Sequence, residues 1–377
     1  MNRPTALIIG DEDVFAHKTA LCLAHGGFAV HALSPRRGTA LRWSRHVTAV
    51  HRLDWDLLKD PGAELVARLE EVAAMARADV IFPVDESPIQ AVGAIADQLS
   101  TATVAVPSTE AFDICNDKHR FAEFCDEHEL PQPPSWQLIP GPDEIPDGLA
   151  FPVIAKPRFG GGGVGVVKLD SQAELADHMR SGAAWAEAPL LVQDFIPGID
   201  VDCSFLAESG RIIASAVQTR TSMHDRTIHF LDRPDVVEVC DRLVAALDYD
   251  GLAHVDLRVD ERDNSVRVIE TNPRVWGSVA YAMQAGINFP ALAADRVVSA
   301  EPAPAGDLQP VAVTNTPIGP GMLARSALRR GAPQELSAAD AAAWEANAGD
   351  PMPNLAMAAR RIFQRIQERV RPANRTA

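Results

Sequence analysis

The sequence predicts a multidomain protein of mixed α/β and α+β class that begins with a doubly wound parallel α/β domain. Ala6–Gly10 and Phe28–Leu33 are short apolar runs on either side of an Ala- and Leu-rich segment, Val14–His25. A strand, a helix and a strand at this spacing form a βαβ unit with parallel strands. From Asn116 onward, apolar runs are joined by turns and a glycine tract instead. The character of the chain therefore changes at this point.

The βαβ pattern continues to about residue 108. We expect a helix around Ala63–Ala78, a strand at Val80–Val84, a helix near Ile89–Leu99 and a strand at Thr103–Val106. Residues 1–108 are therefore assigned to the N-terminal domain. Its first strand–helix turn carries acidic residues where a dinucleotide-binding turn needs glycines, and these would repel a pyrophosphate. We interpret it as an Asp-capped turn.

Further strands and helices are expected beyond residue 116. An amphipathic helix starts at Asp117-Lys118 and stops at the prolines that follow Leu130. The remaining strands are expected at 151–156, 165–169, 190–196, 203–207, 211–218, 253–259 and 265–270, and the helices at 172–181, at 279–286, from 290 and at 357–370. The Pro-, Ala- and Gly-rich stretch 301–310 indicates a linker or a surface loop.

Composition narrows the class of partner. The 377 residues carry a formal net charge of −16, which argues against nucleic acid, and no stretch reaches the roughly 18 uninterrupted apolar residues of a membrane helix. Five cysteines are scattered without a CxxC pair, which indicates reduced thiols. No apolar signal segment follows the first residues. We expect a soluble, cytoplasmic protein without nucleic-acid or membrane partners; a homodimer is left open.

A lysine followed by a run of glycines indicates a phosphate-binding loop. Lys156 ends a predicted strand, and the loop that follows contains Gly160, Gly161, Gly162, Gly163 and Gly165. Glycines allow backbone N–H groups to close around a polyanion, and the lysine adds a point charge. The tract matches neither a Walker A loop nor a dinucleotide turn. A mobile linker is the alternative interpretation.

Two carboxylates and an amide indicate a magnesium site. Glu270 and Asn272 lie two residues apart on a predicted strand, so they share a face. Asp256 lies on the preceding strand, and a turn at Asp260–Asn264 would pair the two strands. Hard oxygen ligands of this kind suit Mg²⁺ bound together with substrate phosphates. The alternative is an exposed hairpin whose polar side chains face water.

These motifs occur in a fixed order. The series is Asp117-Lys118, Ile154–Lys156, the glycine loop, Gln193–Ile196 with Gly198, Asp256, and Glu270-Thr-Asn-Pro-Arg274. Over about residues 110–300 it resembles the ATP-grasp superfamily, and in particular the carboxylate–amine ligases of the carbamoyl-phosphate-synthase type. The resemblance implies an ATP-grasp fold of two α+β subdomains: a small lid subdomain at 109–189 with the glycine loop, and a large subdomain at 190–300 with the magnesium ligands. Residues 301–377 would form a C-terminal extension with a small helical tail.

The resemblance also implies roles for individual residues. Lys118 and Lys156 would contact the nucleotide phosphates under the glycine lid. The segment Gln193, Asp194, Phe195 and Ile196 would bind adenine, with Gln193 replacing the more common Glu, and Asp200 would hold the ribose. Asp256, Glu270 and Asn272 match the magnesium ligands. Arg274 matches the arginine that stabilises the transferring phosphate or the acyl intermediate, and it would also bind substrate together with Ser278, which lies in a segment that resembles the acceptor loop.

The expected activity is that of an ADP-forming carboxylate–amine ligase. A carboxylate attacks the γ-phosphate of Mg-ATP, with Mn²⁺ as the alternative ion, and an amine displaces phosphate from the acyl phosphate. The small-molecule carboxylate and amine, an amino acid or a related compound, are the expected partners. Lys156 and Arg274 would neutralise the transferring group, and Arg226 would hold the acceptor or the γ-phosphate, unless its loop is merely a charged surface.

Alternatives remain for the acceptor and for the C-terminal helix. A bicarbonate-dependent carboxylase, a thiol ligase and a non-catalytic nucleotide-binding module would use the same fold, and a phosphotransferase is a further alternative. The basic helix Met357–Val370 could bind a partner or an acidic surface, or it could dock with a solvated face.

Overall fold

The computed structural model describes residues 3–11, 13–35, 39–138, 145, 149–181, 190–220, 227–314 and 349–370. The chain divides into two compact units. Unit 1 comprises Met1–Val104, Thr221–Phe230 and Val275–Ala377, and unit 2 comprises Ala105–Arg220 and Leu231–Arg274. The predicted class is confirmed, because unit 1 contains a parallel sheet and unit 2 contains antiparallel sheets. The predicted four-part division of the chain stays a prediction.

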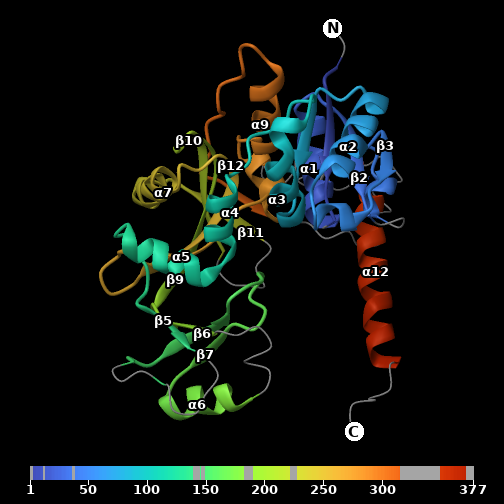
Figure 1. Cartoon of the computed structure of the whole chain (residues 1–377). Helices are drawn as coiled ribbons and strands as arrows, with labels where there is room; N and C mark the ends of the chain where they lie inside the picture. Colours follow the sequence, from blue (N-terminus) through green and yellow to red (C-terminus); the bar gives the residue numbers. More distant parts are fainter. Residues whose placement is uncertain are drawn as a thin grey trace, which may run out of the picture. The chain divides into compact units, whose positions relative to one another are not determined.

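Unit 1 is built around a four-stranded parallel sheet (Figure 1). The strand order is β3-β2-β1-β4, with β1 at Thr5–Ile9, β2 at Ala29–Ser34, β3 at Ala49–Arg52 and β4 at Val80–Pro83. Helices α1 (Asp13–His25) and α2 (Ala63–Ala76) connect the strands, together with the 3-10 helices η1 (Ala40–Trp43) and η2 (Trp55–Leu58). Helix α3 (Glu86–Ile95) and the 3-10 helix η3 (Ala96–Gln98) follow β4.

The apolar run of β1 explains why this sheet is covered on both faces. Ala6 to Ile9 are all fully buried. Leu7 and Ile9 share one face and pack with α2 and α3, for example with Leu69. Because alternate residues of a strand point to opposite faces, the continuous run indicates helices on both sides, as in parallel sheets generally.

The remainder of unit 1 comes from distant parts of the chain. Helices α8 (Val279–Gln284) and α9 (Phe289–Val298) pack on α1. Strand β11 (Thr227–Leu231), whose last residue belongs to unit 2, pairs antiparallel with β14 (Ala312–Thr314). Helix α12 (Pro351–Val370) is the last described element.

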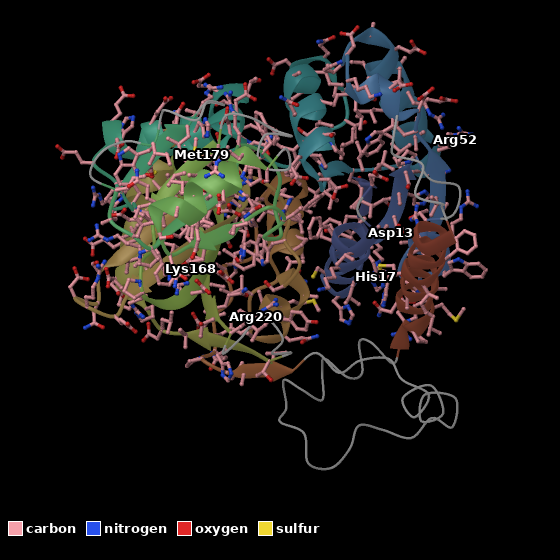
Figure 2. All side chains as sticks on the ribbon, turned by 90° about the horizontal axis from the view of Figure 1, so that it is seen from below. Asp13, His17, Arg52, Lys168, Met179 and Arg220 are labelled. Atoms are coloured by element: carbon pink, nitrogen blue, oxygen red, sulfur yellow. The ribbon has the colours of Figure 1, made fainter. Side chains whose placement is uncertain are left out.

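Two buried carboxylates attach α12 to the sheet domain. Asp350 accepts hydrogen bonds from Ser44 Oγ at 2.5 Å and from the Arg45 amide at 3.0 Å, and it pairs with His17 at 3.0 Å. Arg360 pairs with Asp13 at 2.9 Å. Figure 2 shows Asp13 and His17 on α1 beside α12. The described part of the predicted basic helix is therefore docked, which agrees with the docked alternative, while its binding of a partner stays untested.

The smaller sheet of unit 2 has the order β5-β8-β6-β7 and is antiparallel throughout. Its strands are β5 (Ser135–Leu138), β6 (Val153–Pro157), β7 (Val167–Leu169) and β8 (Leu190–Asp194). Helix α6 (Gln172–Arg180) lies on it (Figure 1), and Leu175 and Met179 pack against Val153 and Val192. This layer holds Lys156 and Gln193 on neighbouring strands.

The larger sheet of unit 2 contains β13-β12-β9-β10, again antiparallel. These strands are β9 (Gly198–Glu208), β10 (Arg211–Thr219), β12 (Gly251–Asp260) and β13 (Val266–Asn272). Helices α4 (Thr109–Asn116), α5 (Lys118–Glu127) and α7 (Pro234–Leu247) pack on one face, where Phe205, Val255 and Leu243 lie in the core. The opposite face of these strands is therefore available for polar side chains.

Several elements differ from the sequence-based expectation. The predicted strand at Thr103–Val106 is wrong in extent, since Thr103 makes only an isolated bridge to Ile81. Strands β3, β5, β11 and β14 and helices α4 and α7 were not predicted. β3 is an edge strand of half-buried residues apart from the exposed Arg52, so it lacks the apolar run of a central strand. No helix in the described ranges is long and apolar enough to cross a membrane.

Candidate active site

The hairpin of β12 and β13 brings the predicted magnesium ligands together. Asp256 lies directly opposite Glu270 in the register, and His254 lies opposite Asn272. Asn272 Nδ2 donates to Asp256 Oδ2 at 3.1 Å. The expected pairing of the two strands is thus present, and two carboxylates and an amide meet at one end of the sheet.

The two carboxylates differ in electrostatic environment. Burial raises the pKa of Glu270, and the positive charge of Lys118 offsets this only in part. Burial also opposes ionisation of Asp256, but the hydrogen bond and the charge of His254 outweigh it and lower the pKa of Asp256. Without a bound cation, the pair therefore shares its negative charge unequally. A divalent cation would favour ionisation of both carboxylates.

Two buried lysines face this carboxylate pair. Lys118, at the start of α5, lies 3.5 Å from Glu270 Oε2 and donates to the Gly160 carbonyl. Lys156, on β6, donates to the Ile269 carbonyl at 3.3 Å. Burial lowers the pKa of Lys156 to about 8. Both cations are held beside the acidic pair, where a phosphate chain could bind them.

The position of Lys118 is fixed by the residue before it. Asp117 caps α5 by accepting from the His119 amide at 3.0 Å. The same carboxylate accepts two hydrogen bonds from Arg158, one of them from Nε at 2.7 Å. Arg158 follows β6 closely, so this fork ties the start of α5 to the glycine loop.

The glycine loop lies next to the end of β13. Gly160, Gly162, Gly163 and Gly165 all have positive φ angles, which other residues rarely adopt. A Cβ placed on Gly161 would lie 3.8 Å from both Arg274 Nη2 and Asn272 Oδ1. Arg274 Nη2 in turn donates to Asn272 Oδ1 at 3.0 Å. The loop, the arginine and the amide are therefore neighbours, as the phosphate-loop interpretation requires.

The predicted adenine segment, residues 193–196, begins at the end of strand β8 in the smaller sheet. Gln193 is buried, and its Nε2 donates to Ser135 Oγ at 2.8 Å. The amides of Asp194 and Phe195 donate to the carbonyls of Pro134 and Pro152, at 3.0 and 3.1 Å. The side-chain amide of Gln193 thus makes a hydrogen bond within the protein, and this contact holds the segment next to Ser135.

Arg258, which was not predicted as a site residue, organises the segment that follows. Its guanidinium donates to the carbonyls of Ile196 and Gly198, the latter at 2.9 Å, and pairs with the exposed carboxylate of Asp200. Gly198 has a φ of 141° and approaches β12 so closely that a Cβ would lie 1.9 Å from the Val259 carbonyl oxygen. Residues 196–200 are therefore held to β12 by one side chain and one glycine.

The roles of two predicted site residues are not tested by the structure. Arg226 lies outside the described residues. Ser278 is buried and belongs to unit 1, whereas Lys118, Lys156 and the carboxylate pair belong to unit 2. Both roles stay predictions.

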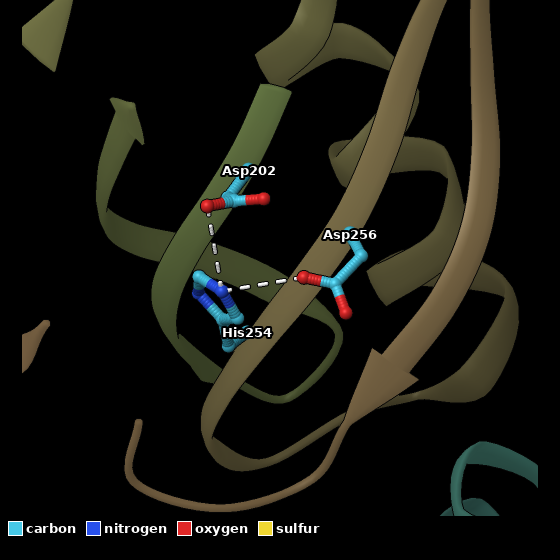
Figure 3. A group of neighbouring side chains, drawn as sticks. All are labelled: Asp202, His254 and Asp256. Atoms are coloured by element: carbon cyan, nitrogen blue, oxygen red, sulfur yellow. Dashed lines mark ion pairs between the residues drawn. The ribbon is translucent and has the colours of Figure 1, made fainter. Parts of the chain in front are cut away.

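Two further polar residues of the site were missed. Asp202 on β9 lies opposite Asp256 in the register, and His254 precedes Asp256 by two residues (Figure 3). Burial raises the pKa of Asp202. Burial opposes protonation of His254, but its hydrogen bond to Asp256 and the charges of both aspartates outweigh it and raise the pKa of His254. The sequence feature that could have revealed them is the alternation of polar residues, at 200 and 202 and at 254 and 256, along otherwise apolar strands.

Part of the chain is similar to known proteins. Residues 186–316 match a family described as ATP-grasp in the biosynthetic pathway with Ter operon. The chain is 26% identical to a carbamoyl phosphate synthase large chain of Corynebacterium glutamicum over 222 residues, or 54% of this chain and 20% of the relative. It is 28% identical to a D-alanine–D-alanine ligase of Nocardia farcinica over 248 residues, or 58% of this chain and 68% of the relative.

The fold is also found among solved structures. An L-amino acid ligase from Bacillus licheniformis matches with a TM-score of 0.59 and 18% identity, covering 81% of this chain and 76% of that chain. Over residues 186–316, the chain is similar to ATP-grasp proteins. The three proteins named here are a synthase and two ligases, and solved structures of a carboxyaminoimidazole ribonucleotide synthetase and of a biotin carboxylase match as well. It spans about a fifth of the length of the carbamoyl phosphate synthase large chains it matches.

Proposed function

We propose that the chain is an ATP-dependent ligase that activates a small-molecule carboxylate as an acyl phosphate and joins it to an amine, releasing ADP and phosphate. The observation that carries the proposal is the meeting of Asp256, Glu270 and Asn272 with the buried Lys118 and Lys156 in one compact unit. Such a set suits a metal-bound polyphosphate better than a neutral ligand. The likeness to ATP-grasp ligases supports the same reading.

The donor set fits magnesium. Asp256, Glu270 and Asn272 supply oxygen atoms on adjacent strands and would hold Mg²⁺, or Mn²⁺, together with ATP. The ion, when bound, neutralises charge on the phosphates of the nucleotide. The protein's own residues would do the rest. Lys118 and Lys156 would bind phosphate oxygens, and Arg274 would stabilise the transferring group. The loop with Gly161, Gly162, Gly163 and Gly165 would exclude water from the acyl phosphate.

The nucleotide base and sugar would lie along residues 193–200. We propose that Asp194, Phe195 and Ile196 contact adenine and that Asp200 contacts the ribose, with Gln193 positioning the segment through Ser135. The carboxylate of Asp200 would then accept hydrogen bonds from the ribose while it stays paired with Arg258.

Location and assembly belong to the same proposal. The five cysteines are free and buried, which supports a reducing compartment such as the cytoplasm. A homodimer stays a prediction, to be checked by light scattering. We also propose the division into an N-terminal domain (1–108), a lid (109–189), a large subdomain (190–300) and an extension (301–377), which limited proteolysis would check.

The test separates loss of chemistry from loss of fold. Lys156→Met keeps the side-chain volume in a buried position and removes the charge, and Glu270→Gln removes a carboxylate with little change in shape. Each variant should lower ATP turnover by about 100-fold or more, because one electrostatic contact to a developing charge is worth that much. Lys59→Met and Glu71→Gln serve as controls, since both side chains are exposed in unit 1.

The outcome is read from ADP release together with circular dichroism. Full ADP release in either site variant would defeat the site assignment, provided the controls behave as wild type.

A further inference from the structure

A mixed cluster of ligand atoms lies beside the proposed nucleotide site. Asp202, His254 and Asp256 each offer one atom, and these atoms all lie within 4.8 Å of one another. Figure 3 shows the imidazole between the two carboxylates, which come from the neighbouring strands β9 and β12. His254 and Asp202 do not belong to the predicted magnesium set, and an imidazole nitrogen is a ligand that Mg²⁺ avoids.

The spacing of the atoms suits a shared cation. His254 Nε2 lies 3.4 Å from Asp256 Oδ1 and 3.8 Å from Asp202 Oδ2. Two ligand atoms bound at about 2.0–2.2 Å to one tetrahedral ion lie about 3.4 Å apart. The separations of His254 Nε2 from the two aspartates are therefore close to those in a coordination shell, and the two carboxylate ligand atoms lie within 4.8 Å of each other.

Residues around the cluster hold its ligands in place. Ser204 Oγ lies 2.8 Å from His254 Nδ1, so the hydroxyl can accept from the Nδ1–H tautomer and leave Nε2 as the ligand atom. Gln218 Nε2 donates to Asp202 Oδ2 at 3.0 Å. Metal-binding histidines in proteins are oriented by such a contact on the second ring nitrogen, and ligating carboxylates are likewise hydrogen-bonded.

We propose that Asp202, His254 and Asp256 bind a divalent transition-metal ion of the Zn²⁺ class, in a site that shares Asp256 with the proposed magnesium set. Three protein ligands leave at least one coordination position for water or a substrate atom, the pattern of reactive rather than purely structural sites. The two carboxylates supply charge, and the imidazole supplies selectivity for a transition metal over Mg²⁺. Binding of the ion does not depend on the proposed ligase reaction; only its use beside the nucleotide would.

The test measures metal binding without nucleotide. The full-length protein is first treated with a chelator and then titrated with Zn²⁺ by calorimetry in excess Mg²⁺, and Co²⁺ is used as a spectroscopic substitute. Wild type should bind one equivalent in this site. His254→Gln and Asp202→Asn should each weaken binding by more than tenfold, and Ser204→Ala by about tenfold, since outer partners of a metal ligand contribute that much.

Two controls locate the ion. Glu270 is not a member of the cluster, so the Glu270→Gln variant should keep Zn²⁺ binding while it loses Mg-ATP binding. A failure of the ligase proposal would therefore be seen separately. His31→Gln removes an imidazole outside the cluster, from a pair in which His31 Nδ1 lies 3.0 Å from His51 Nε2, and this variant should also keep the site.

Several results would overturn the proposal. These are no Zn²⁺ binding by wild type, unchanged affinity in a folded His254→Gln protein, or equal loss in Glu270→Gln, which would place the ion among the proposed magnesium ligands.

Discussion

At the scale of single residues, the buried Lys156 illustrates how the site is charged. Its ammonium lies among Glu270, Lys118 and Asp256, and burial lowers its pKa to about 8. Because the folded-state pKa lies below the usual 10.5, the buried charge destabilises the fold below pH 8, and stability rises as pH increases from about 8 to 10.5. A charge kept at such a cost is typical of a functional site.

This cost gives a stability prediction. Lys156→Met removes a buried charge whose cost of burial exceeds its attraction to Glu270 and Asp256, and it leaves no cavity, so the variant should melt at a temperature equal to or above that of wild type at pH 7. It should also lose the rise in stability between about pH 8 and 10.5. Scanning calorimetry across this pH range measures both effects. A clear drop in melting temperature would show instead that the lysine is a structural cation.

At the scale of elements, Arg258 on β12 connects one strand to the proposed nucleotide segment. It binds the carbonyls of Ile196 and Gly198 and the carboxylate of Asp200 through three nitrogens of a planar group. A lysine keeps the charge but cannot reach three acceptors at once. Arg258→Lys should therefore raise KM for ATP by about tenfold, with a smaller change in kcat, since a charged hydrogen bond contributes about 1.5–3 kcal/mol.

The neighbouring strand provides the matched control for this variant. Arg267 lies opposite Arg258 in the register of β12 and β13, so Arg267→Lys makes the same chemical change beside it. Steady-state kinetics with varied ATP compares the two. Equal KM values for Arg258→Lys and wild type would remove Arg258 from the positioning role.

A second element, helix α12, depends on the carboxylate that precedes it. Burial opposes ionisation of Asp350, but hydrogen bonds from His17, Ser44 and the Arg45 amide outweigh it and lower its pKa to about 2. The usual value is 3.8, so this stabilisation is complete above about pH 4 and is lost as pH falls toward 2. Its size is on the order of 2 kcal/mol.

Asp350→Asn should remove that stabilisation. The variant should melt at a lower temperature than wild type at pH 7 and should show a weaker loss of stability between about pH 4 and 2. The exposed Asp56 gives the control Asp56→Asn in the same unit. If the two variants melt alike across this range, Asp350 does not anchor the helix.

At the scale of the whole molecule, the sequence predicted those features that depend on local pattern. The hairpin that carries Asp256 and Glu270 follows from the alternation of polar and apolar residues and from a turn of five residues, and the sequence shows both. The glycine loop could likewise be predicted, because its residues are adjacent in the sequence. Asp202 and His254 were missed because their meeting depends on β9 lying beside β12, and this strand order skips the two strands between them in the chain.

Other misses had different physical causes. Strand β3 is paired on one side only and lacks a buried run. Helix α7 carried a readable signal, because Val236, Cys240, Leu243 and Leu247 recur at helical spacing and are all buried. Ser278 belongs to unit 1 and the carboxylate pair to unit 2, because the division into two units falls between Arg274 and Val275.

The central claim is that the chain forms an acyl phosphate from ATP. The most direct measurement is a screen of carboxylate and amine pairs with Mg-ATP, in which nucleotide products are separated and the new product is weighed by mass spectrometry. The account predicts ADP and phosphate in equal amounts, together with a product whose mass is that of carboxylate plus amine minus water. Release of AMP and pyrophosphate, or product formation that is unchanged in Glu270→Gln, would contradict it.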